Sequence, residues 1–83
     1  MLDELKTQRK VVGIKQLRRA LRDGQVVRVF VAENADPQLT QPVADACSAA
    51  DVELIWVPTM TELGKACGIS VGAAAAGILI SAG

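Results

Sequence analysis

The order of apolar and polar positions along the chain predicts alternating strands and helices. Two runs rich in β-branched residues, 26–32 and 52–57, are almost unbroken by polar side chains. Such runs are typical of strands that are covered on both faces. They therefore predict helices on both sides of a sheet. A last apolar segment, residues 73–81, is interpreted as a further buried strand.

The segments between these strands carry helical periodicity or helix-start signals. In residues 14–23 the apolar side chains recur at helical spacing on one face: Ile14, Leu17 and Leu21. A second helix is predicted to open at Thr40 and Pro42, since proline is tolerated in a first turn. Its apolar face would be formed by Val43, Ala46, Cys47 and Ala50.

The remaining segments complete the predicted topology. Residues 2–9 are a short helical candidate, and residues 11–13 a brief edge strand. Thr59 and Glu62 have the spacing of a capping box, which predicts a short helix that ends at Gly68. The alternation indicates an α/β fold, a three-layer α/β/α sandwich around a small mixed four-stranded sheet. Without repeats or linkers, residues 1–83 are expected to form a single domain.

The neutral formal charge hides two halves of opposite sign. Residues 1–28 hold eight basic residues against three acidic ones, a balance of +5, and residues 29–83 hold one against six, a balance of −5. Charge asymmetry of this kind marks a candidate interaction face. Half of the basic residues of the first segment form one stripe on the predicted helix 14–23: Lys15, Arg18, Arg19 and Arg22.

A basic stripe is most often only a solvated helix face, but the position of this one favours nucleic-acid binding. Gly13 directly precedes the helix, so a phosphate backbone could approach the free helix N–H groups there. Lys15 and Arg19 lie one turn apart, and the Gln16 amide offers both a donor and an acceptor for base edges. The loop of residues 68–72, GISVG, could cover an unstacked base.

Other classes of function find little support in the residues. The chain has no histidine, tyrosine, P-loop, GxGxxG or nucleophile elbow, so no catalytic residue, metal ligand or cofactor site is expected. Cys47 and Cys67 are interpreted as reduced core residues, in keeping with a cytoplasmic protein. No apolar run is long enough for a membrane span. Phe30 and Trp56, the only aromatic residues, are expected in the core, which argues against single-strand binding by base stacking.

Three separated motifs, GIKQLRRAL, VAENADP and LGKACGISVG, resemble the ribosomal protein L-seven-Ae family, which includes the L-thirty-e proteins. The likeness extends from about residue 9 onward and is close to the bacterial kink-turn-binding members. It implies an α/β/α sandwich that binds kink-turns, which are RNA helices bent sharply at a bulge beside tandem sheared G·A pairs.

The resemblance also implies which residues would contact RNA. The motif that begins at Gly13 would meet the G·A pairs and adjoining backbone through Gly13, Ile14, Lys15, Gln16 and Arg19. The apolar loop against the bulged nucleotides corresponds to Ile69, Ser70 and Val71. Asp36 and Thr40 match positions near a flipped-out base, and Lys65 would reach a phosphate.

The implied partner is structured RNA, within a ribosome or another ribonucleoprotein, and the protein is expected to act as a monomer. The alternative is a protein-interaction module within a ribonucleoprotein, in which the acidic half docks a partner and the basic helix serves solubility.

Overall fold

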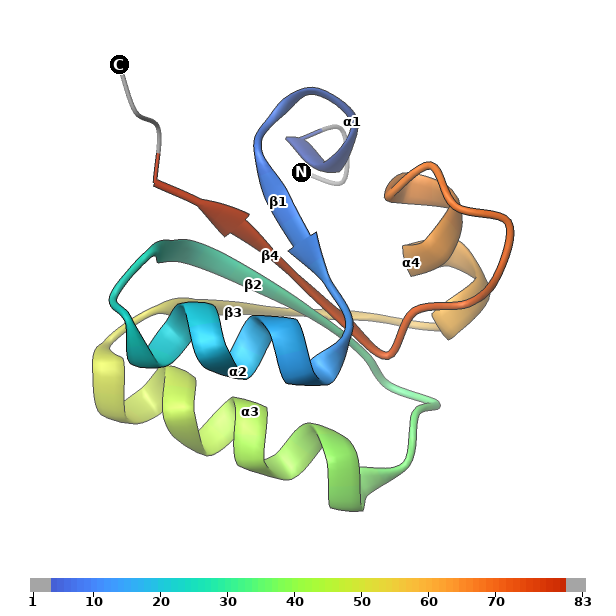
Figure 1. The fold of residues 1–83 in the computed structure, drawn as a ribbon. Coiled ribbons are helices and arrows are strands. Elements are labelled where there is room, and N and C mark those ends of the chain that lie inside the picture. Colours follow the sequence, from blue (N-terminus) through green and yellow to red (C-terminus); the bar gives the residue numbers. More distant parts are fainter. Residues whose placement is uncertain (1–3, 81–83) are drawn as a thin grey trace.

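The structure is a computed structural model that describes residues 4–80 (Figure 1). The ends of the predicted segments 2–9 and 73–81, at Leu2–Asp3 and Ser81, lie outside these residues. The elements follow in the order α1 (Glu4–Thr7), β1 (Lys10–Val12), α2 (Ile14–Arg22), β2 (Val26–Ala32), α3 (Pro37–Ala50), β3 (Glu53–Val57), α4 (Met60–Ala66) and β4 (Ala75–Leu79).

The strands form one mixed sheet in the order β1-β4-β2-β3. β2 pairs with β3 in parallel and with β4 antiparallel, and β1 pairs antiparallel with β4. The described residues thus confirm the predicted four-stranded mixed sheet, including β1 as a brief edge strand. They also confirm that the last apolar segment forms a strand, which lies inside the sheet between β1 and β2.

β2 is the strand on which both cores rest. Val29 and Val31 belong to the core under α2 and α3. Phe30 and Ala32, which point to the other face, belong to the core with Leu5 of α1 and the apolar side of α4. These four residues of β2 are fully buried. Their alternation is the period of an extended strand, so one apolar run supplies both cores.

The helices divide between the two faces of the sheet as the apolar run 26–32 predicts. The expectation that the run 52–57 is also covered on both faces was wrong, because only Val57 of the edge strand β3 is buried. α2 and α3 pack side by side on one face, and α1 and α4 lie on the other (Figure 1). Leu17 and Leu21 of α2 and Val43 and Cys47 of α3 are buried against the sheet, while Ile14 and Ala46 are half-buried. Ala50, predicted on the same apolar face, is exposed at the last turn of α3. The three-layer α/β/α sandwich is confirmed.

The predicted start of the second helix was wrong. α3 begins at Pro37, and the Asp36 carboxylate accepts a hydrogen bond of 2.9 Å from the Gln38 N–H. An aspartate N-cap followed by proline at the first helical position is a stronger start signal than Thr40 and Pro42. Pro42 therefore lies inside the helix, where it removes one backbone donor.

The two aromatic residues differ in their environment. Phe30 is fully buried, as predicted, but Trp56 is 49% exposed, so its expected place in the core was wrong. β3 is an edge strand, which has a neighbouring strand on one side only. A large side chain on such a strand is covered from fewer directions than one on β2.

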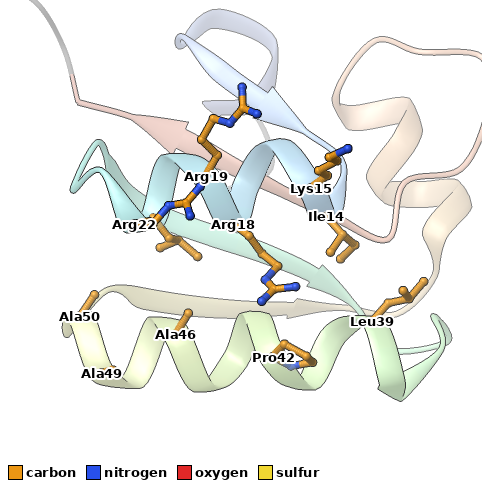
Figure 2. A pocket seen from close by; sticks show the side chains of 11 residues that line it. Ile14, Lys15, Arg18, Arg19, Arg22, Leu39, Pro42, Ala46, Ala49 and Ala50 are labelled. Atoms are coloured by element: carbon orange, nitrogen blue, oxygen red, sulfur yellow. The ribbon is translucent and has the colours of Figure 1, made fainter.

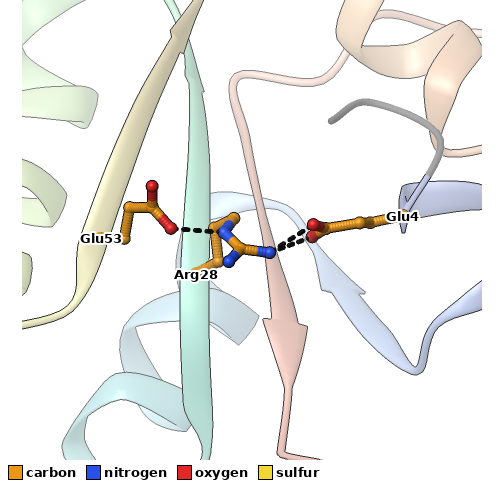
Figure 3. Close-up of polar contacts among 3 residues, drawn as sticks. All are labelled: Glu4, Arg28 and Glu53. Carbon is orange, nitrogen blue, oxygen red and sulfur yellow. Dashed lines mark hydrogen bonds and ion pairs between the residues drawn. The ribbon is translucent and has the colours of Figure 1, made fainter.

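α1 is tied to the sheet by a charged bridge (Figure 3). The guanidinium of Arg28, on β2, donates from Nε to Glu53 Oε1 at 2.6 Å and from Nη1 to both carboxylate oxygens of Glu4. These hydrogen bonds, to Glu53 first and then to Glu4, raise the pKa of Arg28. Arg28 therefore links the first helix to the sheet edge formed by β3.

Both cysteines are buried free thiols, which confirms their prediction as reduced core residues. Burial raises the pKa of Cys47 and, against a smaller opposing effect of Lys10, that of Cys67. Because burial favours the neutral thiol, both side chains act as small apolar groups in the core.

Candidate functional site

One end of the sheet gathers the connecting segments of the fold. The carboxyl ends of β1, β2 and β3 and the amino end of β4 meet there, so α2, α3 and α4 all begin at this end (Figure 1). The segments are joined by backbone hydrogen bonds: the Gly13 N–H donates to the Ala75 carbonyl and the Ala32 N–H to the Ala74 carbonyl, both at 2.9 Å. We call this end, formed by residues 13–16, 33–36 and 68–72, the loop end.

The amino terminus of α2 is open at the loop end. Gly13 is its N-cap, with φ 104° and ψ 151°, a backbone conformation that is essentially restricted to glycine. Among the described residues no side chain caps this helix, and its first turn contains no acidic residue. The N–H groups of its first turn, from Ile14 to Gln16, thus point out of the helix without a side-chain acceptor.

The electrostatics of this terminus favour an anion. The N–H groups give a helix start a positive potential, which an aspartate or glutamate usually offsets. Here the first turn carries Lys15 instead, and its side chain is exposed. The positive potentials of the backbone N–H groups and of the Lys15 ammonium group therefore add up at the start of α2.

The loop 68–72 is held in place by α4. The Ile69 N–H donates to the Gly64 carbonyl at 3.1 Å, and the Ala73 N–H donates to the Met60 carbonyl at 3.0 Å. Gly64 permits a close approach, because a Cβ at this position would lie 2.1 Å from the Val71 carbonyl oxygen. The loop nevertheless leaves two apolar side chains in solvent, Ile69 at 37% and Val71 at 68% exposure.

The segment 33–36 contributes a residue that the sequence analysis missed. Asn34 Oδ1 accepts a hydrogen bond of 2.8 Å from the Met60 N–H at the start of α4. Asn34 therefore positions the α4 terminus relative to α3 across the loop end. The only sequence signal was an asparagine between a strand and an Asp-Pro helix start, which indicates a turn but not its partner.

Most of the predicted site residues lie at the loop end, but not all of them. Gly13, Ile14, Lys15, Gln16, Asp36, Ile69, Ser70 and Val71 belong to its three segments. Asp36 is exposed but its carboxylate caps α3. Thr40 is buried, and its hydroxyl donates to the Asp36 carbonyl at 3.5 Å, so it does not face outward. Lys65 is exposed on α4, on the other side of the sheet from α2 and next to the loop 68–72.

The basic stripe of α2 divides in two. All four of its residues are exposed: Lys15, Arg18, Arg19 and Arg22. Figure 2 shows Lys15 and Arg19 pointing away from α3, whereas Arg18 points toward α3. The stripe that the sequence presents as one feature thus serves two surfaces.

The described residues offer no other obvious chemistry. Within residues 4–80 no group of three or more metal-ligating side chains lies together. In the same range, none of the helices has the length and apolar character needed to cross a bilayer.

The chain is similar to known proteins over most of its length. A sequence model of the ribosomal protein L7Ae/L30e/S12e/Gadd45 family matches residues 2–82. An RNA-binding protein of Geobacillus sp. (strain WCH70) is 47% identical over 75 residues, which cover 90% of this chain and 92% of that protein. The RNA-binding protein YbxF of Geobacillus stearothermophilus is 48% identical over 69 residues, or 83% of this chain and 84% of that protein.

A solved structure supports the fold. The Giardia lamblia 15.5kD RNA binding protein superposes with a TM-score of 0.88 at 23% identity, covering 98% of this chain and 72% of that one. At this identity the likeness concerns the fold.

The backbone of Gly13 gives a first testable prediction. Gly13→Ala should lower the free energy of unfolding by roughly 1–3 kcal/mol, the cost of holding a non-glycine residue in such a region. A Cβ there meets nothing within 4 Å, so the cost comes from the backbone alone. Urea denaturation would measure it. A synthetic chain with D-alanine at position 13, which accepts positive φ, should keep most of the stability, and equal losses in both chains would contradict this account.

Gly64 gives a second prediction, on the position of the loop. Gly64→Ala places a methyl group against the Val71 carbonyl and should destabilise the fold by about 1–3 kcal/mol or displace residues 68–72. Thermal unfolding and the amide NMR shifts of the loop would report either result. Lys65→Ala, on the exposed neighbouring position, is the matched control and should change neither. Unaltered stability and unaltered loop shifts in Gly64→Ala would show that the contact does not hold the loop.

Proposed function

The chain belongs to the ribosomal protein L7Ae/L30e/S12e/Gadd45 family, and on this premise we propose that it binds structured RNA through the loop end, with a kink-turn as the target. The observation that carries the proposal is the uncapped start of α2 beside an exposed apolar loop. The curated relatives reported above are named RNA-binding proteins, and neither name describes an enzyme.

Phosphate groups are the natural ligands of the α2 terminus. Its open N–H groups and positive potential suit a phosphate oxygen, as at other helix starts. Gly13 has no side chain that would hold the backbone of an RNA at a distance. The space around its Cβ position is also open, because no atom of the chain lies within 4 Å of it. Lys15 and Arg19 add charge on the side of α2 that points away from α3 (Figure 2).

Base recognition would use the adjacent side chains. Gln16 is exposed within the first turn of α2 and can both donate to and accept from a base edge. Ile69 and Val71 are exposed on the neighbouring loop, where they can cover the face of an unstacked base. These side chains could not reach the bases of regular double-stranded RNA, whose major groove is too deep and narrow for side chains to read.

A kink-turn provides both features that the loop end requires. Its sharp bend widens the groove beside the sheared G·A pairs, and its bulge supplies unstacked bases. The protein would stabilise a bent RNA conformation that is already sampled, because a ligand shifts an equilibrium toward the state it binds better. Binding of this kind includes no chemical step, so we propose that the chain acts in a ribonucleoprotein rather than as an enzyme.

The experiment that tests the proposal is a titration of a kink-turn duplex labelled at both ends with a fluorophore pair. Binding should be tight and should shorten the end-to-end distance. A control duplex in which Watson–Crick pairs replace the G·A pairs should bind weakly and stay extended. Equal, salt-sensitive binding of both duplexes would reduce the interaction to nonspecific attraction. The absence of binding to either would refute the RNA proposal.

Two variants of α2 separate recognition from general attraction. Arg19→Ala should weaken binding of the kink-turn by about 1–3 kcal/mol, the range for a base-directed contact. Arg22→Ala, at the far end of the helix, should mainly reduce the salt dependence, by about one unit in the slope of log K against log salt. Fluorescence titrations at several salt concentrations would measure both. Small and equal effects would mean that the stripe acts only as a diffuse charge.

A further inference from the structure

A second surface feature lies along the side of α2, away from its open terminus. A groove of about 880 Å³ runs between α2 and α3 (Figure 2). It is lined on one side by α2, with Ile14, Arg18 and Arg22 among its residues. On the other side it is lined by five residues of α3: Leu39, Pro42, Ala46, Ala49 and Ala50. The groove therefore extends from the loop end to the carboxyl ends of both helices.

The groove exists because the facing side of α3 is built from small residues. Beneath it the helices meet the sheet through buried leucine, valine and cysteine side chains. Nearer the surface α3 presents Pro42, Ala46, Ala49 and Ala50, which lack the volume to fill the space up to α2. Leu39, 48% exposed, closes the end near the loops. The α3 wall is thus apolar throughout.

The opposite wall is basic. Lys15, Arg18, Arg19 and Arg22 all line the groove at some part of their length, and none of its described lining residues is acidic. Arg18 reaches toward α3 with its guanidinium group above the apolar wall (Figure 2). A ligand here would meet apolar contacts on one side and several positive charges on the other.

This combination does not suit a nucleic acid. RNA presents phosphate and sugar groups, which need hydrogen-bond donors or cations around them. The α3 wall offers leucine, proline and alanine side chains and none of either. It suits instead a polypeptide whose apolar side chains fill the groove while its carboxylates face α2.

We propose that the α2–α3 groove binds an acidic amphipathic helix of a partner protein. α2 has nine residues and is therefore about 13–14 Å long, which matches two to three turns of a third helix. Large apolar residues on one face of this helix would occupy the space left by Ala46, Ala49 and Ala50. Its glutamate or aspartate residues would pair with Arg18 and Arg22. This inference does not depend on the proposed RNA function.

The test uses two synthetic peptides and the full-length protein. The first is a 14-residue peptide with leucine at i, i+3, i+4 and i+7 and glutamate on the flanking positions. The second has the same composition with the leucines dispersed, and an identical lactam bridge keeps both helical. Fluorescence anisotropy would give the affinities, and amide NMR shifts would show which residues respond.

Two groove variants and one control complete the design. Arg18→Glu reverses a charge at the basic wall, and Ala49→Glu places a carboxylate at an exposed position of the apolar wall. Each should weaken binding of the first peptide about tenfold or more. Arg9→Glu reverses an exposed charge outside this groove and should have little effect.

The outcomes separate the proposal from its competitors. Binding of the first peptide alone, with shifts on α2 and α3 and with losses in both groove variants, supports the proposal. The same affinity for the dispersed peptide, no binding of either peptide, or equal effects of all three substitutions would overturn it. Loss of kink-turn binding in Ala49→Glu would assign the groove to RNA and would equally refute it, whereas unchanged kink-turn binding leaves the two functions separate.

Discussion

Burial of β2 on both faces is the constraint on which the rest of the fold depends. Val29 and Val31 on one face and Phe30 and Ala32 on the other are fully buried, so each face of the strand must be covered by helices. In a chain of 83 residues this requires helices after nearly every strand and leaves no room for long connections. Three of the covering helices, α2, α3 and α4, follow β1, β2 and β3 directly and so begin at a common end of the sheet.

The position of the candidate site follows from this arrangement of short connections. Its short segments are fixed by backbone hydrogen bonds, such as that from the Gly13 N–H to the Ala75 carbonyl, together with the side-chain acceptors of Asn34 and Asp36. At the same end Ile69 and Val71 are exposed although they are apolar. Because the backbone holds its conformation before binding, little ordering cost would be paid on association.

The sequence predicted most features that depend on local patterns, and its other misses depend on neighbours in space. Periodicity placed all four strands and α2, since apolar runs and helical spacing are properties of contiguous residues. The start of α3 was misplaced because the sequence analysis did not use a stronger local signal, Asp36 followed by Pro37. The exposure of Trp56 follows from strand order, which no local pattern records. The α2–α3 groove could not be predicted from the sequence, because its existence depends on α3 packing beside α2.

The two surfaces proposed here use different parts of one helix, and their separation follows from helix geometry. The terminus of α2 offers backbone N–H groups directed along the helix axis, whereas its flank offers side chains directed across it. Lys15 and Arg19 point away from α3, and Arg18 points toward it, so the basic positions are directed to different sides of α2 (Figure 2). Gly13 opens the axial direction, and the small residues of α3 open the lateral one. A nine-residue helix can therefore offer one surface at its end and another along its side, with Lys15 and Arg19 on the border of both.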